Sequence, residues 1–130
     1  MIRLRCSGNP PTEMELSGTR SELTELRDAI LRFCTRKRPL LEVPVDQEAD
    51  PAPYERRLSG LRLIRAKDKL RILIEGQRLF ITGQLDLLEV FARALPCDAE
   101  QVPSQVHFNA VDRVDHVEPD SLGIVLVLIS

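Results

Sequence analysis

The sequence contains one short unit twice. Residues 78–95 align with residues 13–30 without a gap when Gly83 is placed over Gly18. Each copy reads as an alternating stretch, a small residue and the glycine, a polar residue, and then apolar residues at helical spacing. This pattern predicts a strand, a turn and an amphipathic helix. The matched pairs are Leu16 with Ile81, Ser17 with Thr82, Ser21 with Asp86, Leu23 with Leu88, Leu26 with Phe91, Ala29 with Ala94 and Ile30 with Leu95.

The length of the chain indicates that the two copies belong to a single domain. A chain of 130 residues can bury one core but is short for two. We therefore expect a first half over 1–45, a linker loop over 46–59 that is acidic and rich in proline, and a second half over 60–130. The copies should be related by an approximate twofold axis.

Alternation and turn residues predict the remaining elements. Residues 1–6 and 14–17 should form a hairpin, and the first helix should start at Thr19 with Glu22 in a capping box, although Ser21 is a rival cap. Asp86 with Glu89 should cap the second helix in the same way. Further strands are expected over 39–45, 61–66, 70–74, 78–83, 105–110 and 122–129, the first at a sheet edge and the last inside a sheet.

These elements predict an α+β fold. Two helices should pack on an antiparallel β-sheet of about seven or eight strands, with a two-residue turn at Gly76 and Gln77. The second helix is apolar over more than one stripe, so a second sheet or a partner subunit should cover it.

Charge and composition argue against several partners. The net charge is −2 and only 4% of residues are aromatic, so we expect neither nucleic acid nor anionic lipid as a partner. The apolar run at 122–129 is too short to cross a bilayer. Basic residues crowd 36–71 and acidic residues crowd 98–120. If the fold brings each group together, one face is basic and another acidic.

The three cysteines Cys6, Cys34 and Cys97 are far apart and form no CxxC pair. This usage is typical of reduced thiols and predicts a cytoplasmic protein with neither a disulfide framework nor a zinc site. The first residues contain no apolar run long enough for a signal peptide.

The residues give little support for catalysis. His107, Asp112, Asp115 and His116 are close in sequence, but their spacing matches no compact metal-ligand motif. Ser104 and Ser121 lack a recognisable base nearby, and a triad assembled from distant residues is left open. We expect no cofactor, no metal and no enzymatic activity.

The acidic connection near the end of the chain is the best candidate for binding. Asp112, Asp115, Glu118 and Asp120 should lie on an irregular segment beside a rigid strand, as recognition loops do. Acidic surfaces associate readily with basic partners. The alternative is a solvated acidic loop without a partner.

Two stretches resemble a known family. The segments ELSGTRSELTELRDAI and VHFNAVDRVDHVEPDSLGIVLVLI resemble the immunity protein 32 family of bacterial polymorphic toxin systems. The matching positions near the end are His107, Pro119, Ser121 and Leu122. The resemblance implies a cytoplasmic protein that binds and blocks a cognate toxin by occlusion, without catalysis.

From exposure and charge we predict a binding surface made by the acidic connection and its neighbouring strand ends. An alternative function is a small structural or regulatory domain that self-associates, with a homodimer through the helix around Phe91. The candidate partner-binding residues are His107, Asp112, Asp115, His116, Glu118 and Asp120.

Overall fold

The computed structural model describes residues 1–8, 11–48 and 50–130. Within them the chain forms two helices and nine strands, so the α+β class is confirmed with slightly more strands than expected. In chain order the elements are β1 (Arg3–Gly8), β2 (Pro11–Gly18), α1 (Arg20–Thr35), β3 (Leu40–Pro44), β4 (Arg56–Arg57), β5 (Gly60–Arg65), β6 (Arg71–Glu75), β7 (Arg78–Gly83), α2 (Leu85–Ala94), β8 (Ser104–Phe108) and β9 (Ile124–Leu128).

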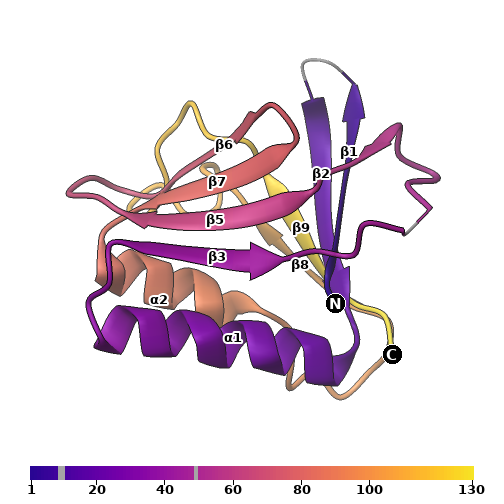
Figure 1. Cartoon of the computed structure of the whole chain (residues 1–130), viewed down its shortest axis with the longest axis horizontal. Helices are drawn as coiled ribbons and strands as arrows, with labels where there is room; N and C mark the ends of the chain where they lie inside the picture. Colours follow the sequence, from indigo (N-terminus) through magenta and orange to yellow (C-terminus); the bar gives the residue numbers. More distant parts are fainter. Residues whose placement is uncertain (9–10, 49) are drawn as a thin grey trace.

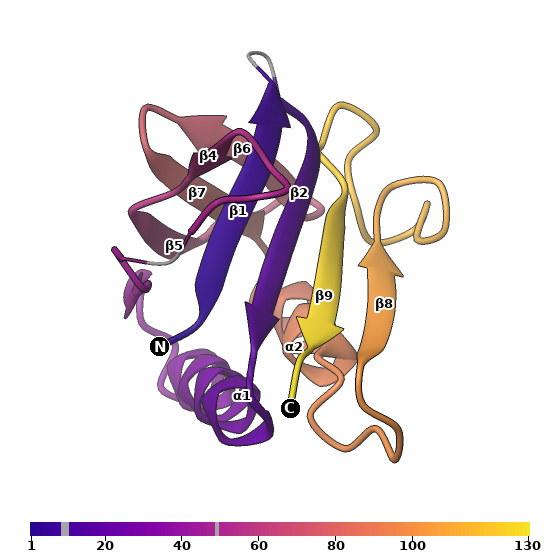
Figure 2. The ribbon, with the colours of Figure 1, turned by 90° about the vertical axis from the view of Figure 1, so that its right-hand side faces the viewer.

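The strands form two mixed sheets instead of one antiparallel sheet. Sheet A has the order β4-β1-β2-β9-β8, and sheet B has the order β3-β5-β7-β6. The pairs β2–β9 and β5–β7 are parallel, while β1–β2, β3–β5, β6–β7 and β8–β9 are antiparallel. Figure 1 shows sheet B above the two helices, which lie side by side, and Figure 2 shows sheet A from its outer face.

Several expected details are confirmed. The strands β1 and β2 form the predicted hairpin, β3 lies at a sheet edge, and β9 lies inside sheet A. Gly76 has a φ of 61° in the two-residue turn between β6 and β7, where a side chain would be strained.

The two halves of the chain are interleaved. After α1, strand β3 joins sheet B, and after α2, strand β8 joins sheet A. The expected linker also takes part in the fold, because β4 pairs with β1 and Leu58 is fully buried. Each half therefore completes the sheet of the other, and the buried side chains of both sheets belong to one core cluster.

The internal repeat is visible in the strand registers. Gly18 is opposite Leu128 and Gly83 is opposite Arg65, in each case at the end of a parallel ladder that leads into a helix. One row of paired residues that crosses sheet B corresponds to one row that crosses sheet A. They are Leu41, Leu63, Ile81 and Ile72 in sheet B, and Val106, Leu126, Leu16 and Leu4 in sheet A.

The two helices begin differently. Thr19 caps α1 in a complete capping box, because its hydroxyl accepts from the amide of Glu22 and its own amide donates to the Glu22 carboxylate at 2.8 Å. The expected cap at Asp86 is wrong. Helix α2 starts after Gln84, whose side chain makes no capping hydrogen bond. The amide of Gln84 instead donates to the carbonyl of Asp68 at 3.1 Å, which fixes the entry into the helix.

The capping box predicts an acid-sensitive contribution to stability. Burial raises the pKa of the Glu22 carboxyl, but hydrogen bonds from the terminal ammonium of Met1 and from Thr19 outweigh this and hold the pKa below its ordinary value of 4.5. A lowered folded pKa stabilises the fold above pH 4.5, and this contribution is lost as the pH falls through the folded pKa. We expect Glu22→Gln to lower the free energy of unfolding by about 1 kcal/mol at pH 7 and to have a smaller effect near pH 3, as measured by urea unfolding.

The control for this prediction is Glu25→Gln, on the exposed side of the same helix outside the capping box. It should leave the free energy of unfolding nearly unchanged at both values of pH. An equal loss for Glu22→Gln at pH 7 and pH 3 would contradict the assignment, since the missing charge would then not matter.

The apolar circumference of α2 is covered in part within the chain, since Leu85, Leu87, Val90 and Ala94 are half-buried. Leu88, Phe91 and Ala92 are buried, and α1 packs alongside. The Phe91 ring meets the Phe108 ring of β8 edge-on, with centroids 5.2 Å apart and an interplanar angle of 88°. Phe91 is therefore inaccessible, and the expected homodimer stays a prediction whose contact would have to lie elsewhere on the helix. No helix in the described part of the chain is both long and apolar enough to cross a membrane.

Candidate protein-binding site

The connection between β8 and β9 runs from sheet A to the edge of sheet B and back. Leu70, just before β6, donates its amide to the carbonyl of His116 at 2.8 Å and accepts from the amide of Glu118 at 2.8 Å. The amide of Leu122 donates to the carbonyl of Ile72 at 2.9 Å. Val117 is 1% exposed and forms a parallel bridge with Leu70. This half of the connection covers the outer edge of β6 and is not free.

The other half, residues 109–116, is an exposed turn that we call the acidic turn. The side-chain oxygen of Asn109 accepts from the amide of Asp112 at 2.8 Å, and its carbonyl accepts from the amide of Arg113 at 3.1 Å. The Arg113 guanidinium lies 4.6 Å from the centroid of the Phe108 ring. Lys69 donates to the carbonyl of Val114 at 3.1 Å. The acidic turn is thus anchored from both sheets.

The outer surface of the acidic turn is apolar at its centre and acidic beside it. Val111 is 89% exposed and Val114 is 67% exposed, and both are among the most exposed large hydrophobic residues of the described chain. Asp112 and Asp115 next to them are also exposed. Two exposed valines on one turn form a small apolar surface beside carboxylates, and apolar surface rimmed by polar residues can serve as a contact for another protein.

The candidate residues divide between the two halves of the connection. His107, Asp112, Asp115 and His116 line one surface hollow together with Arg113 and Val114. Glu118 and Asp120 lie outside this hollow, on the half of the connection that runs along the edge of β6. Asp120 forms an exposed ion pair with Arg71 at 3.5 Å. The structure thus places His107, Asp112, Asp115 and His116 at one hollow and Glu118 and Asp120 outside it, and the binding role of all six stays a prediction.

The hollow is not arranged as a metal site. No group of three or more His, Cys, Asp or Glu side chains is placed to hold a metal ion among residues 1–8, 11–48 and 50–130. His107 is exposed, whereas the Nδ1 atom of His116 is buried and makes no hydrogen bond in that part of the chain.

The basic residues do not form a separate face near this site. Arg71 forms an ion pair with Asp120, and the side-chain ammonium of Lys69 donates to a backbone carbonyl of the acidic turn. Elsewhere, Arg62 pairs with Glu42 and lies over the Phe80 ring, with 5.7 Å to the centroid. Basic residues of β5 and β6 are thus paired with acidic residues that are far apart from them in sequence, at both sides of sheet B.

Cys34 and Cys97 offer no activated thiolate. Cys6 and Cys97 are buried, Cys34 is half-buried, and all three are free thiols. Burial raises the pKa of the Cys34 and Cys97 thiols, which keeps them protonated at neutral pH.

Sequence reasoning missed the two valines of the acidic turn. The segment is dominated by charged residues, and two valines three residues apart would fit one helical turn but are too few to predict either an element or an exposed patch. Only the exposure of these two valines distinguishes them from core residues, and exposure is known only once the fold is known.

The functional assignment rests on these residues, because the comparisons with known proteins give no match. No family model matches the chain, and no curated protein or solved structure matches it at a significant level.

Proposed function

We propose that this chain is an immunity protein that binds and neutralises a cognate bacterial toxin in the cytoplasm by occlusion, without catalysis. The observation that carries the proposal is the acidic turn, which holds Val111 at 89% and Val114 at 67% exposure next to the exposed Asp112 and Asp115. The resemblance to the immunity protein 32 family supports it, because the second resembling stretch contains the whole turn.

The arrangement suits a partner with a basic rim around an apolar patch. Burying two exposed valines favours association through the hydrophobic effect, and the fixed backbone means that little conformational entropy is lost on binding. Carboxylates beside the patch attract a basic surface and speed its encounter. A stable interface needs about 800 Å² from each protein, so His107 and Glu118 beside the turn should also contribute.

The proposal predicts a specific effect of Val111→Arg. Placing a bulky cation at the centre of the patch should weaken binding to the toxin by at least tenfold, because it removes apolar contact and opposes a basic partner. The melting temperature should not change, since Val111 is almost fully exposed. The measurement is co-expression with each neighbouring gene product that is toxic on its own, followed by titration calorimetry of the neutralised pair.

Val102→Arg is the matched control, because Val102 is 45% exposed in the loop before β8 and outside the acidic turn. It should bind and protect like the native chain. Equal protection by Val111→Arg and Val102→Arg would remove the acidic turn from the interface. If no neighbouring product is toxic and neutralised by the native chain, the immunity function itself fails.

Electrostatic attraction also predicts a salt dependence. Raising ionic strength from 0.05 M to 0.5 M shortens the Debye length from roughly 14 Å to roughly 4 Å, so the association rate constant should fall. Asp112→Asn combined with Asp115→Asn should lower the rate at low salt and flatten this dependence, as measured by stopped-flow fluorescence. An unchanged salt dependence in the double variant would show that these carboxylates do not steer the partner.

A further inference from the structure

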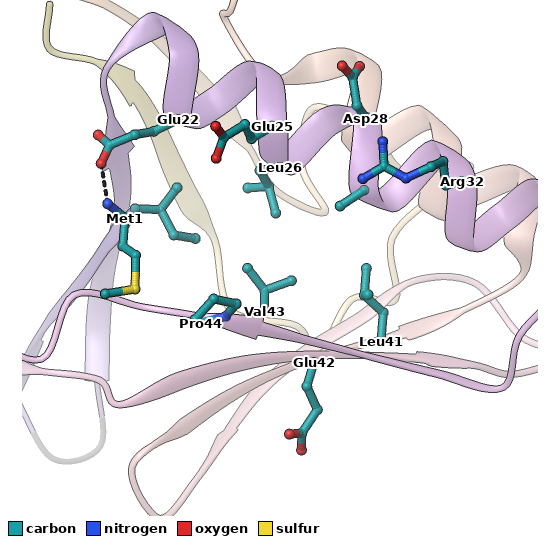
Figure 3. A pocket seen from close by; sticks show the side chains of 12 residues that line it. Met1, Glu22, Glu25, Leu26, Asp28, Arg32, Leu41, Glu42, Val43 and Pro44 are labelled. Carbon is teal, nitrogen blue, oxygen red and sulfur yellow. Dashed lines mark hydrogen bonds and ion pairs between the residues drawn. The ribbon is translucent and has the colours of Figure 1, made fainter.

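A groove separates α1 from the edge strand β3 (Figure 3). Its volume is about 380 Å³. Figure 3 shows Leu41 and Val43 pointing from β3 towards α1, while Glu42 points to the opposite side of the strand. The apolar lining is completed by Ile2, Leu26, Ala29 and Pro44.

The internal repeat identifies the place in the second half of the molecule that is equivalent to this groove. Leu26 of α1 corresponds to Phe91 of α2 in the ungapped alignment of the two units. Val43 of β3 corresponds to Phe108 of β8, because Val43 is opposite Leu61 and Phe108 is opposite Ile124 at equivalent places in the two sheets.

In the second half, two aromatic rings in edge-on contact fill the space between helix and edge strand. In the first half, a leucine and a valine occupy the same positions and a groove remains. The fold therefore contains two equivalent places between a helix and an edge strand. The one in the second half is filled by aromatic rings, and the one in the first half has room for a large apolar side chain.

The edge of β3 beside the groove is open to pairing. In sheet B the connection covers the outer edge of β6, whereas β3 pairs with β5 on its inner side and no further described strand lies beyond it. The amide of Arg65 donates to the carbonyl of Pro39 at 3.0 Å. Because alternate residues of an antiparallel strand turn their amides to opposite edges, the backbone groups of Leu40 and Glu42 face outwards.

The charges along the groove have a direction. Glu25 lies at the end near Pro44, where Glu22 is paired with the terminal ammonium of Met1. Arg32 lies beside Asp28 towards the other end, where a second hollow continues past Arg36 and Arg38. An extended segment matches this pattern if it is basic at one end, apolar in its middle and acidic at the other. From Glu22 to Arg36 the helix rises about 21 Å, which a seven-residue strand spans.

We infer that the groove binds an extended segment of a partner protein that adds to the free edge of β3 and inserts a large apolar side chain between Leu26 and Val43. With antiparallel addition, the basic residue precedes the apolar one and lies near Glu25, and the acidic residue follows near Arg32. This surface is at the opposite edge of sheet B from the acidic turn, so the inference does not rest on the proposed function.

The test uses a synthetic peptide, acetyl-KTFTVTE-amide, titrated into the ¹⁵N-labelled full chain. Binding should shift the amide resonances of Leu40, Glu42 and Ala29 and leave those of the acidic turn in place. Replacing the phenylalanine of the peptide by serine, or N-methylating the amides that would face β3, should weaken binding at least tenfold. Reversing the peptide to acetyl-ETVTFTK-amide should also weaken it.

Variants of the chain test the same contact from the other side. Val43→Phe with Leu26→Phe reproduces the aromatic pair of the second half, so it should fill the groove and reduce peptide affinity at least tenfold. Glu25→Lys should weaken binding about threefold through its charge alone and keeps the test valid if the double variant does not fold. Glu75→Lys, at the end of β6, is the matched control and should bind like the native chain.

Three results would overturn the inference. The first is no resonance shift in β3 or α1 at millimolar peptide. The second is binding that is indifferent both to the phenylalanine of the peptide and to Glu25→Lys. The third is self-association of the native chain that Val43→Phe abolishes without any peptide binding, because the groove would then belong to a contact between two copies.

Discussion

Phe91→Ala is expected to lower the free energy of unfolding by about 3–5 kcal/mol. Phe91 is fully buried, and its ring packs edge-on against Phe108, so the substitution removes both the apolar contacts and the aromatic geometry. The pair also joins α2 to β8 and so connects the helix to sheet A. Since a domain of this size is stable by about 5–15 kcal/mol in total, the variant should be marginally folded. Urea unfolding followed by far-UV circular dichroism measures the loss.

Phe80→Ala is the matched control because Phe80 is a half-buried phenylalanine on β7, with Arg62 over its ring. Its cost should be about 1 kcal/mol, as for a residue that leaves no closed cavity. If the two variants lose the same stability, the aromatic pair is not the centre of the core that joins helix and sheet. A Phe91→Leu variant should recover much of the loss, since it restores most of the volume.

The local elements could be predicted from the sequence because their signals are local. The alternation in β1 and β2, the glycine before each helix, and the two-residue turn at Gly76 depend on neighbouring residues only. The repeat adds a longer-range constraint, because an alignment of Gly18 with Gly83 requires equivalent surroundings. The equivalent parallel ladders that end at these two glycines confirm this constraint.

Strand pairing could not be predicted in the same way. Alternation identifies a strand but does not indicate its neighbour or its direction, so the parallel pairs β2–β9 and β5–β7 and the exchange of β3 and β8 between sheets were missed. The predicted cap of α2 is wrong for a related reason. Asp86 satisfies the local pattern, but the hydrogen bond between Gln84 and Asp68 fixes the helix start from outside the segment.

The candidate site was partly predictable. Charge alone indicates the acidic turn, and the fold places His107 and His116 on one hollow with Asp112 and Asp115. The packing of Val117 under the edge of sheet B is invisible in the sequence, because Val111, Val114 and Val117 recur at the same spacing and yet only Val117 is buried. The groove beside β3 is a difference between two copies of one site, and it emerges only when the helix and the edge strand are placed together.

Gly83→Ala is expected to lower the free energy of unfolding by about 2–3 kcal/mol. A methyl group on Gly83 would lie 2.8 Å from the Cδ2 atom of Leu70, 3.1 Å from its Cα atom and 3.2 Å from its amide nitrogen. Leu70 cannot withdraw easily, because it is fully buried and its amide is bonded to the carbonyl of His116. The overlap should therefore be relieved by a shift of the backbone at Leu70, which also holds the connection. Urea unfolding gives the cost, and faster hydrogen exchange at the amides of Leu70 and Glu118 would show where the strain goes.

Gly18→Ala separates this effect from the general effect of adding a methyl group before a helix. Its nearest neighbours would be the Cβ atom of Glu22 and the Cδ2 atom of Leu23, both at 3.3 Å and both on side chains. The Leu23 methyl group can give by rotation, and the Glu22 Cβ atom needs a shift of only a few tenths of an ångström in the first turn of α1, so the cost should stay below about 1 kcal/mol. The two glycines are equivalent in the strand registers but not in what faces them. If both variants lose the same stability, the backbone of Leu70 does not require a glycine at position 83, and the link from the second repeat to the acidic connection is weaker than the contacts indicate.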